Sequence, residues 1–86
     1  MKPEEIRKLL EQDKLIIGHN AVRSAIKDGS CSQVLVASNA ESSRATSLRG
    51  FCSLSKLECV DLDMRNDVLG RTCRKPFSIS FLAVKA

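Results

Sequence analysis

Residues 14–29 read KLIIGHNAVRSAIKDG, and this stretch decides the fold because it carries a strand, a turn and a helix in succession. Residues 15–17 are consecutive apolar residues that end at Gly18, which is the pattern of a short buried strand. Apolar residues then recur at helical spacing, at Val22, Ala25 and Ile26. Asn20 is placed to cap this helix, and Gly29 is placed to end it. We therefore predict a strand that leads through Gly18 into a helix.

The same two patterns alternate along the rest of the chain. They predict helices over residues 3–12, 45–52 and 66–72, and strands over residues 34–37, 57–62 and 77–84. Because residues 34–37 are all apolar, that strand is expected inside a sheet that helices cover on both faces. Parallel pairing is expected across each strand–helix–strand unit, although mixed sheets are common. The prediction is an α/β fold, a three-layer α/β/α sandwich in which four helices alternate with a four-stranded sheet.

Size and composition indicate one globular domain over residues 1–86. The chain is 43% hydrophobic, which is normal for a folded domain. It has no Trp or Tyr and only three Phe, so aliphatic side chains must fill the core and few rings remain for stacking on bare bases. We expect Leu35 and Phe81 on central strands of that core.

The net charge of +4 is concentrated at one end of the chain. Residues 1–67 carry ten basic and ten acidic side chains and sum to zero. No acidic residue follows Asp67, whereas four basic residues do: Arg71, Arg74, Lys75 and Lys85. A local basic cluster favours an anionic partner such as RNA. The alternative interpretation is that the excess basic side chains only make an ordinary protein surface more soluble.

The reactive side chains do not predict an enzyme. The four cysteines lack the close pairs typical of zinc sites and His19 is the only histidine, so we expect no metal and no cofactor. Asp61 and Asp63 are interpreted as a solvated strand end. No apolar stretch approaches the ~20 residues that span a bilayer, and the charged N-terminus does not resemble a signal peptide. These features predict a cytoplasmic protein with free thiols and no membrane contact.

The turn Gly18–His19–Asn20 is the strongest candidate for binding. The first backbone N–H groups of a helix lack partners and favour phosphate or a carbonyl edge. Gly18 lets a ligand backbone come close, and the Asn20 amide can both donate to and accept from a base edge. The alternative is that Asn20 is an ordinary helix cap.

Two stretches of the chain resemble one known family. Residues 14–29 are similar to the first half of the kink-turn RNA-binding ribosomal proteins, which include the large-subunit proteins L7Ae and L30e. Residues 68–84, VLGRTCRKPFSISFLAV, are similar to that family's closing motif of Leu-Gly, a short helix, a basic turn and an apolar strand. The resemblance covers nearly the whole chain. It implies a three-layer α/β/α sandwich that binds a sharply bent RNA loop with tandem sheared G·A pairs, in a ribosome or another ribonucleoprotein.

The resemblance also implies site residues. In the family, a Gly-x-Asn-Glu turn reads guanine edges, and a lysine one turn later contacts the RNA backbone. Gly18 and Asn20 match this motif, whereas Ala21 and Ser24 replace the Glu and the Lys. Charge that can replace them is available on the same helix, at Arg23 and Lys27.

The loop before the fourth helix, residues 62–66, sets specificity in the family. Here Asp63 is a poor neighbour for phosphate, while Met64 can pack on an extruded base. With the turn and the basic end of the chain, this loop completes the set of residues predicted to bind RNA: Gly18, His19, Asn20, Arg23, Ser24, Lys27, Leu62, Asp63, Met64, Arg65 and Arg71.

We expect a monomer whose partner is ribosomal RNA or a small guide RNA, together with other ribonucleoprotein proteins. Two alternatives stay open. One is a protein-interaction module of the same fold, which the charge balance of residues 1–67 favours. The other is an RNA-substrate-binding domain like the one that precedes the catalytic domain in one class of RNA ribose methyltransferases. The Gly-x-x-Ala-Val-x-x-Ala-Ile pattern of residues 18–26 also resembles that domain.

Overall fold

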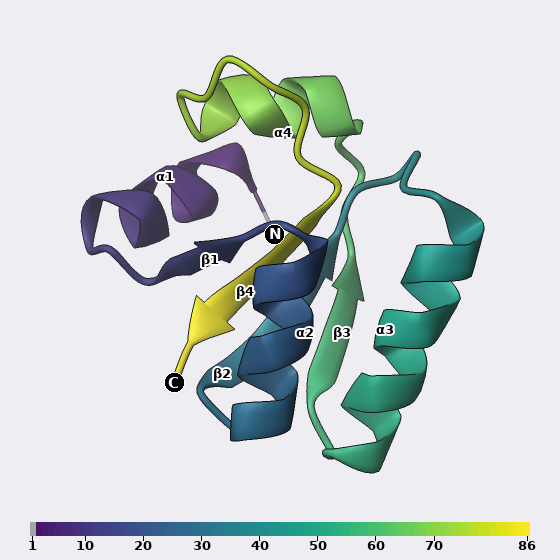
Figure 1. Cartoon of the computed structure of the whole chain (residues 1–86). Coiled ribbons are helices and arrows are strands. Elements are labelled where there is room, and N and C mark those ends of the chain that lie inside the picture. The colour runs from purple at the N-terminus through teal and green to yellow at the C-terminus, as the bar shows by residue number, and fades with distance from the viewer. Residues whose placement is uncertain (1) are drawn as a thin grey trace.

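The computed structural model describes residues 2–86, in which four helices alternate with four strands (Figure 1). The elements are, in chain order, α1 (Pro3–Glu11), β1 (Leu15–Ile17), α2 (His19–Asp28), β2 (Cys31–Val36), α3 (Ser42–Leu54), β3 (Glu58–Asp61), α4 (Asn66–Thr72) and β4 (Phe81–Lys85). Every predicted helix and strand is present, and Gly29 ends α2 in the left-handed conformation, as predicted. The largest difference in bounds concerns the last strand.

The sheet is mixed, with the strand order β1-β4-β2-β3. β2 and β3 pair in parallel across α3, as predicted. β4 lies between β1 and β2 and runs antiparallel to both. The parallel pairing expected of β1 with β2, and of β3 with β4, is therefore wrong, because the chain returns after α4 to insert its last strand at the centre. The two central strands contain Phe81 and Leu35, which are both buried, as predicted.

Helices cover both faces of the sheet, α2 and α3 one face and α1 and α4 the other, which makes the predicted three layers (Figure 1). Successive residues of β2 alternate between two cores. Val34 and Val36 pack with α2 and α3, whereas Leu35 packs with α1 and α4. In β4, Phe81 and Leu82 divide in the same way. The unbroken apolar runs in the sequence arise because both faces of the central strands are buried.

The last strand begins at Phe81 rather than at Phe77, the predicted start. Ile79 packs in the core under α1 and α4, whereas Phe81 packs in the core on the opposite face, so the two-residue alternation breaks at Ser80. The N–H of Ile79 donates to the carbonyl of Asn66 (3.0 Å). We call residues 74–80, which join α4 to β4, the Phe77 segment.

Two features at the end of α4 place the Phe77 segment. A Cβ added to Gly70 would lie 2.1 Å from the Phe77 carbonyl oxygen, so only glycine allows this contact between helix and segment. Arg74 then takes a left-handed conformation with φ 58°, which is usually occupied by glycine at the end of a helix. The N–H of Lys75 closes the turn by donating to the Gly70 carbonyl (3.0 Å).

The cysteines are free thiols that fill apolar core space. Cys31, Cys52 and Cys73 are buried, and Cys59 is partly buried. Burial raises the pKa of Cys52 to about 11 and also raises the pKa of Cys31 and of Cys73. Within residues 2–86, no group of three or more His, Cys, Asp or Glu side chains can hold a metal ion, and no helix is long and apolar enough to cross a membrane.

Candidate nucleic-acid interface

An open cleft lies where three connections of the chain meet. Its walls are the turn between β1 and α2, the connection between β2 and α3, and the Phe77 segment with the first residue of α4. The cleft has a volume of about 560 Å³. Polar, charged and aromatic side chains line it together, among them His19, Asn39, Arg44, Asn66 and Phe77.

The Gly18 turn, residues 17–20, forms one wall of the cleft. Gly18 has φ 104° and ψ 150°, a conformation that other residues rarely adopt, and its N–H donates to the Phe81 carbonyl (3.1 Å). Gly18 is itself the N-cap of α2, and no side chain within residues 2–86 caps the helix. The predicted cap by Asn20 is therefore wrong. Asn20 is exposed in the first turn of α2, which leaves its amide available to a ligand.

His19 presents a buried polar atom at the same wall. Its ring packs edge-on against Phe81, with the ring centres 5.5 Å apart. The Nε2 atom is buried and has no hydrogen-bond partner among the described residues. The His19 ring thus forms part of this wall through its packing against Phe81.

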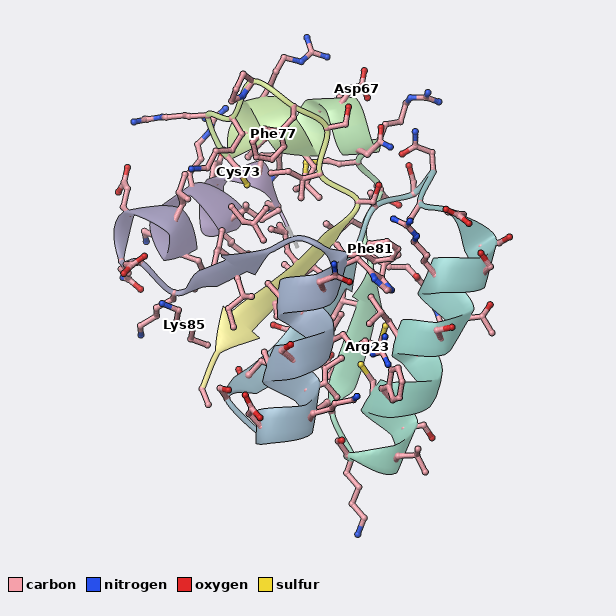
Figure 2. The ribbon with its side chains drawn as sticks, viewed as in Figure 1. Arg23, Asp67, Cys73, Phe77, Phe81 and Lys85 are labelled. Atoms are coloured by element: carbon pink, nitrogen blue, oxygen red, sulfur yellow. The ribbon has the colours of Figure 1, made fainter. Side chains whose placement is uncertain are left out.

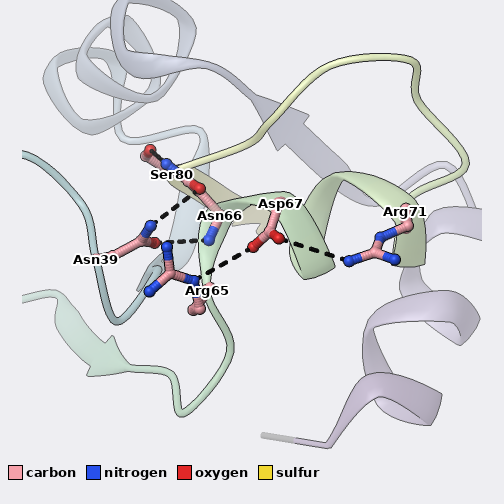
Figure 3. A network of polar contacts seen from close by, with 6 residues as sticks. All are labelled: Asn39, Arg65, Asn66, Asp67, Arg71 and Ser80. Atoms are coloured by element: carbon pink, nitrogen blue, oxygen red, sulfur yellow. Dashed lines mark hydrogen bonds and ion pairs between the residues drawn. The ribbon is translucent and has the colours of Figure 1, made fainter.

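Three polar side chains, from Asn39, Asn66 and Ser80, connect the other two walls by hydrogen bonds (Figure 3). Oδ1 of Asn39 accepts from the backbone N–H of Asn66 (2.7 Å), and Nδ2 of Asn39 donates to Oδ1 of Asn66 (3.1 Å). Nδ2 of Asn66 donates to Oγ of Ser80 (3.3 Å). α4 begins at Asn66, and its N-cap residue Arg65 makes no side-chain cap. The cap comes instead from Asn39, which lies in the connection between β2 and α3.

Phe77 is the exposed aromatic ring at the cleft, and it lies over α4 (Figure 2). Its side chain is 54% exposed, in contrast to the strand position predicted for it. Phe77 also lines a second hollow of about 440 Å³, together with Arg71 and Lys75. An exposed ring beside basic side chains is typical of proteins that stack on single-stranded bases.

Two predicted site residues beside α4 share one acidic partner. Nε of Arg65 lies 3.6 Å from Oδ1 of Asp67, and Nη2 of Arg71 lies 3.5 Å from Oδ2 (Figure 3). All three side chains are exposed, and exposed pairs contribute only about 0–1 kcal/mol. A phosphate can therefore compete with Asp67 for either guanidinium.

Arg23 and Lys27 point toward α3 and do not line the cleft (Figure 2 labels Arg23). Cζ of Arg23 lies 5.5 Å from the centre of the Phe51 ring, and Nζ of Lys27 lies 5.9 Å from it. Both distances fit a cation–π contact. The structure thus brings these two predicted cations together, one and two turns along α2 from the Gly18 turn. Ser24 is exposed on the same helix.

The loop between β3 and α4 has a mixed character. Leu62 is 3% exposed and packs in the core with Leu69. Met64 is half-buried against the same core. Asp63 and Arg65 are the exposed members of this loop among the predicted site residues.

Most of the cleft residues lie outside the set predicted from sequence, among them Asn39, Asn66 and Phe77. The sequence does hold a signal that Phe77 lies outside the strand, because proline is rare inside a central strand and Pro76 directly precedes Phe77. It holds none for Asn39, whose partner Asn66 is 27 residues away. A polar residue in a short connection predicts a turn and does not reveal which distant element it caps.

The sequence of residues 3–86 matches the family described as Ribosomal protein L7Ae/L30e/S12e/Gadd45. The chain belongs to this family. The large ribosomal subunit protein eL30 of Methanosphaerula palustris is 30% identical in an alignment of 90 positions. The alignment covers 92% of this chain and 79% of that protein. The eL30 of Methanosphaera stadtmanae is 28% identical over 80 residues, which cover 93% of this chain and 82% of that protein. Membership of the L7Ae/L30e family confirms the resemblance seen in the two sequence motifs.

Solved structures share the fold. A 15.5kD RNA-binding protein of Giardia lamblia superposes with a TM-score of 0.84 at 16% identity, over 94% of this chain and 68% of that one. A Bacillus halodurans protein of unknown function has a TM-score of 0.84 at 20% identity, over 91% of this chain and 77% of that one. These similarities confirm the predicted three-layer fold of this L7Ae/L30e family member.

Proposed function

We propose that this protein binds structured RNA as part of a ribosome or another ribonucleoprotein, and that it is a binding module and not an enzyme. The observation that carries this proposal is the meeting of three features at one cleft. These are the uncapped start of α2, the amides of Asn39 and Asn66, and the exposed ring of Phe77. The helix start and the ring suit different parts of an RNA, and the amide pair joins the walls of the cleft. The chain also belongs to a family that includes ribosomal proteins.

The chemistry of each group suggests its RNA contact. Unpaired N–H groups at the start of α2 favour phosphate or carbonyl oxygens, and Asn20 offers both a donor and an acceptor to a base edge. The ring of Phe77 offers a face to an unstacked base. Phosphates suit the basic side chains around the cleft and along α2: Arg23, Lys27, Arg65, Arg71 and Lys75.

The finer proposal is that the ligand is a kink-turn or a similarly bent RNA, ribosomal or small guide RNA, bound by a cytoplasmic monomer. A bent internal loop exposes base edges and extruded nucleotides. Phe77 lines the cleft, and Asn20 is exposed on α2 directly after His19, which lines the cleft as well. Ala21 and Ser24 lack the charge found in the family motif. We therefore expect weaker binding than that of a family member with Glu and Lys there.

A gel-shift titration against a kink-turn duplex and a straight duplex of matched length tests this proposal. Asn20→Ser should weaken kink-turn binding by about 1–3 kcal/mol, the range of a good bidentate base contact in DNA, and hardly change straight-duplex binding. Because Asn20 does not cap α2, the melting temperature of the Asn20→Ser variant should equal that of the wild type. Arg23→Ala and Lys27→Ala should weaken both RNAs alike and flatten the salt dependence.

The double variant Ala21→Glu with Ser24→Lys supplies the opposite test. If RNA docks on α2 as in the family motif, this variant should bind the kink-turn more tightly than the wild type. A wild-type protein with no preference for the kink-turn, together with a double variant that gains nothing, would favour the protein-interaction module.

A further inference from the structure

Asn66 joins three parts of the cleft through four hydrogen bonds. Figure 3 shows those to Asn39 and Ser80. Two of them link it to Asn39, one from its backbone N–H and one to its side-chain oxygen (2.7 and 3.1 Å). The side-chain amide donates to Ser80 (3.3 Å), and the backbone carbonyl accepts from the N–H of Ile79 (3.0 Å). One residue thus ties the β2–α3 connection to α4 and to the Phe77 segment.

This arrangement exceeds what a helix cap requires. A cap needs one acceptor for a free N–H of the first turn, and a Ser or Asp at the N-cap position would supply it locally. Here the cap comes from Asn39, and the returning bond from its Nδ2 makes the contact reciprocal. Two bonds between two planar amides restrict orientation as well as distance. Asn39 and Asn66 both line the cleft, so their contact joins two of its walls, the β2–α3 connection and the start of α4.

The same contacts determine where the Phe77 ring lies. The ring is 54% exposed, so little side-chain packing holds it. Its backbone contacts Gly70 on one side. On the other side, the N–H of Ile79 donates to the Asn66 carbonyl, and Nδ2 of Asn66 donates to Oγ of Ser80. A ring that is already in place binds an unstacked base more tightly, because less ordering is needed on binding.

We propose that Asn39 and Asn66 are positioning residues of the RNA-binding site. Their amide pair fixes the start of α4, and through Ile79 and Ser80 it holds the Phe77 segment where the ring can stack on one unpaired base. The two residues act through Phe77, and a direct contact with RNA is not required. This inference rests on the proposed RNA binding at the cleft and adds the residues that set its geometry.

The test compares four alanine variants on two RNAs. Asn39→Ala, Asn66→Ala and Ser80→Ala each break the network. Ser32→Ala is the matched control, since it removes one side-chain hydrogen bond, from Ser32 to the Val84 carbonyl (3.4 Å), at the opposite end of β2 and β4. The RNAs are a kink-turn duplex with an unpaired nucleotide at its bend, and the same duplex with that nucleotide made abasic.

Wild-type protein should bind the intact RNA about tenfold more tightly than the abasic RNA, which matches the stacking of one base on an aromatic ring. Asn39→Ala and Asn66→Ala should lose about tenfold on the intact RNA and almost nothing on the abasic RNA. Their double variant should bind no more weakly than the worse single variant, because both disable one unit. Ser32→Ala should match the wild type on both RNAs.

Equal losses on both RNAs, or no loss on either, would overturn the inference, since a residue that only stabilises the fold changes both affinities by one factor. Melting curves taken alongside identify any variant that is unfolded at the assay temperature. Ser80→Ala loses a single hydrogen bond and carries the comparison if the asparagine variants fail to fold. If the wild type binds neither RNA, the proposed function fails as well, which separates that outcome from failure of the positioning role alone.

Discussion

The Gly18 turn and the Phe77 segment form facing walls of one cleft, yet they are built differently. The turn takes its shape from its own residues, because Gly18 at φ 104° joins a strand directly to a helix. The segment takes its shape from residues elsewhere, since Gly70 admits its backbone and Asn66 anchors its end. One wall is therefore encoded locally and the other by tertiary contacts, and substitutions in the two walls should have different effects.

The largest effect is expected where the segment packs on its helix. Gly70→Ala should lower the free energy of unfolding by about 3 kcal/mol, because the new Cβ would lie 2.1 Å from a backbone oxygen and the helix and the segment must separate. Gly50→Ala is the control, as its Cβ meets nothing within 4 Å, and it should stabilise α3 by about 0.5–1 kcal/mol. Urea titrations measure both, and equal midpoints would contradict the described packing.

The corresponding substitution in the turn should cost less. Gly18→Ala meets no atom within 4 Å, so strain at φ 104° is the whole penalty, about 1–3 kcal/mol. The same urea titration measures it. A loss larger than that of Gly70→Ala would reverse the contrast between the two walls.

The next effect concerns RNA binding. Phe77→Ala should weaken binding of the kink-turn duplex by about 1–3 kcal/mol, the value of stacking one base on a ring. Because the ring is 54% exposed, the melting temperature should hardly change. Leu54→Ala removes another exposed apolar side chain, 84% exposed at the end of α3, and should bind as the wild type does. Equal affinities of the Phe77 and Leu54 variants would exclude the ring from the interface.

A smaller effect is expected from relieving the backbone strain at Arg74, at the start of the Phe77 segment. Arg74→Gly should raise the free energy of unfolding by about 0.5–1 kcal/mol. A non-glycine residue at φ 58° is strained by about 1–2 kcal/mol, and the greater freedom of glycine in the unfolded chain offsets about 0.4–1 kcal/mol of that. It also removes a positive charge beside Phe77, so RNA binding should weaken slightly and become less sensitive to salt. Thermal melts measure the change in stability, and salt titrations of RNA binding measure the change in affinity. A variant that melts below the wild type would show that Arg74 makes contacts worth more than the strain.

The smallest effect is a change in the alkylation rate of Cys73, which reports whether the Phe77 segment stays packed against α4. Cys73 is 1% exposed at the end of α4, and burial raises its pKa, so alkylation by iodoacetamide at pH 8 should be slower there than at the partly buried Cys59. The rate at Cys73 should keep rising above pH 9.0, the ordinary value, as the thiolate forms. Gly70→Ala should speed this labelling and Gly18→Ala should not. Peptide mass spectrometry after timed quenching separates the sites, and equal rates in both variants would contradict the prediction.

Short-range patterns predicted most of the framework. The apolar run of residues 15–17, the helical spacing after Gly18 and the stop at Gly29 all describe neighbours within one or two turns of chain. The burial of β2 on both faces was predicted because every residue of 34–37 is apolar. In the site, the Gly18 turn and the exposed Asn20 were predicted for the same reason, since they depend on a glycine, a strand end and a helix start that are adjacent in sequence.

The sequence by itself thus determined the elements, the three layers and the Gly18 turn, since these follow from spacing and local backbone preference. Only the tertiary structure decided that β4 lies between β1 and β2, because alternation shows which face of a strand is buried and not which strand lies beside it. It also decided that Phe77 is exposed, that Asn39 caps α4, and that Arg23 lies on Phe51. Each of these depends on a contact between residues far apart in sequence, which forms only once the chain has returned through α4.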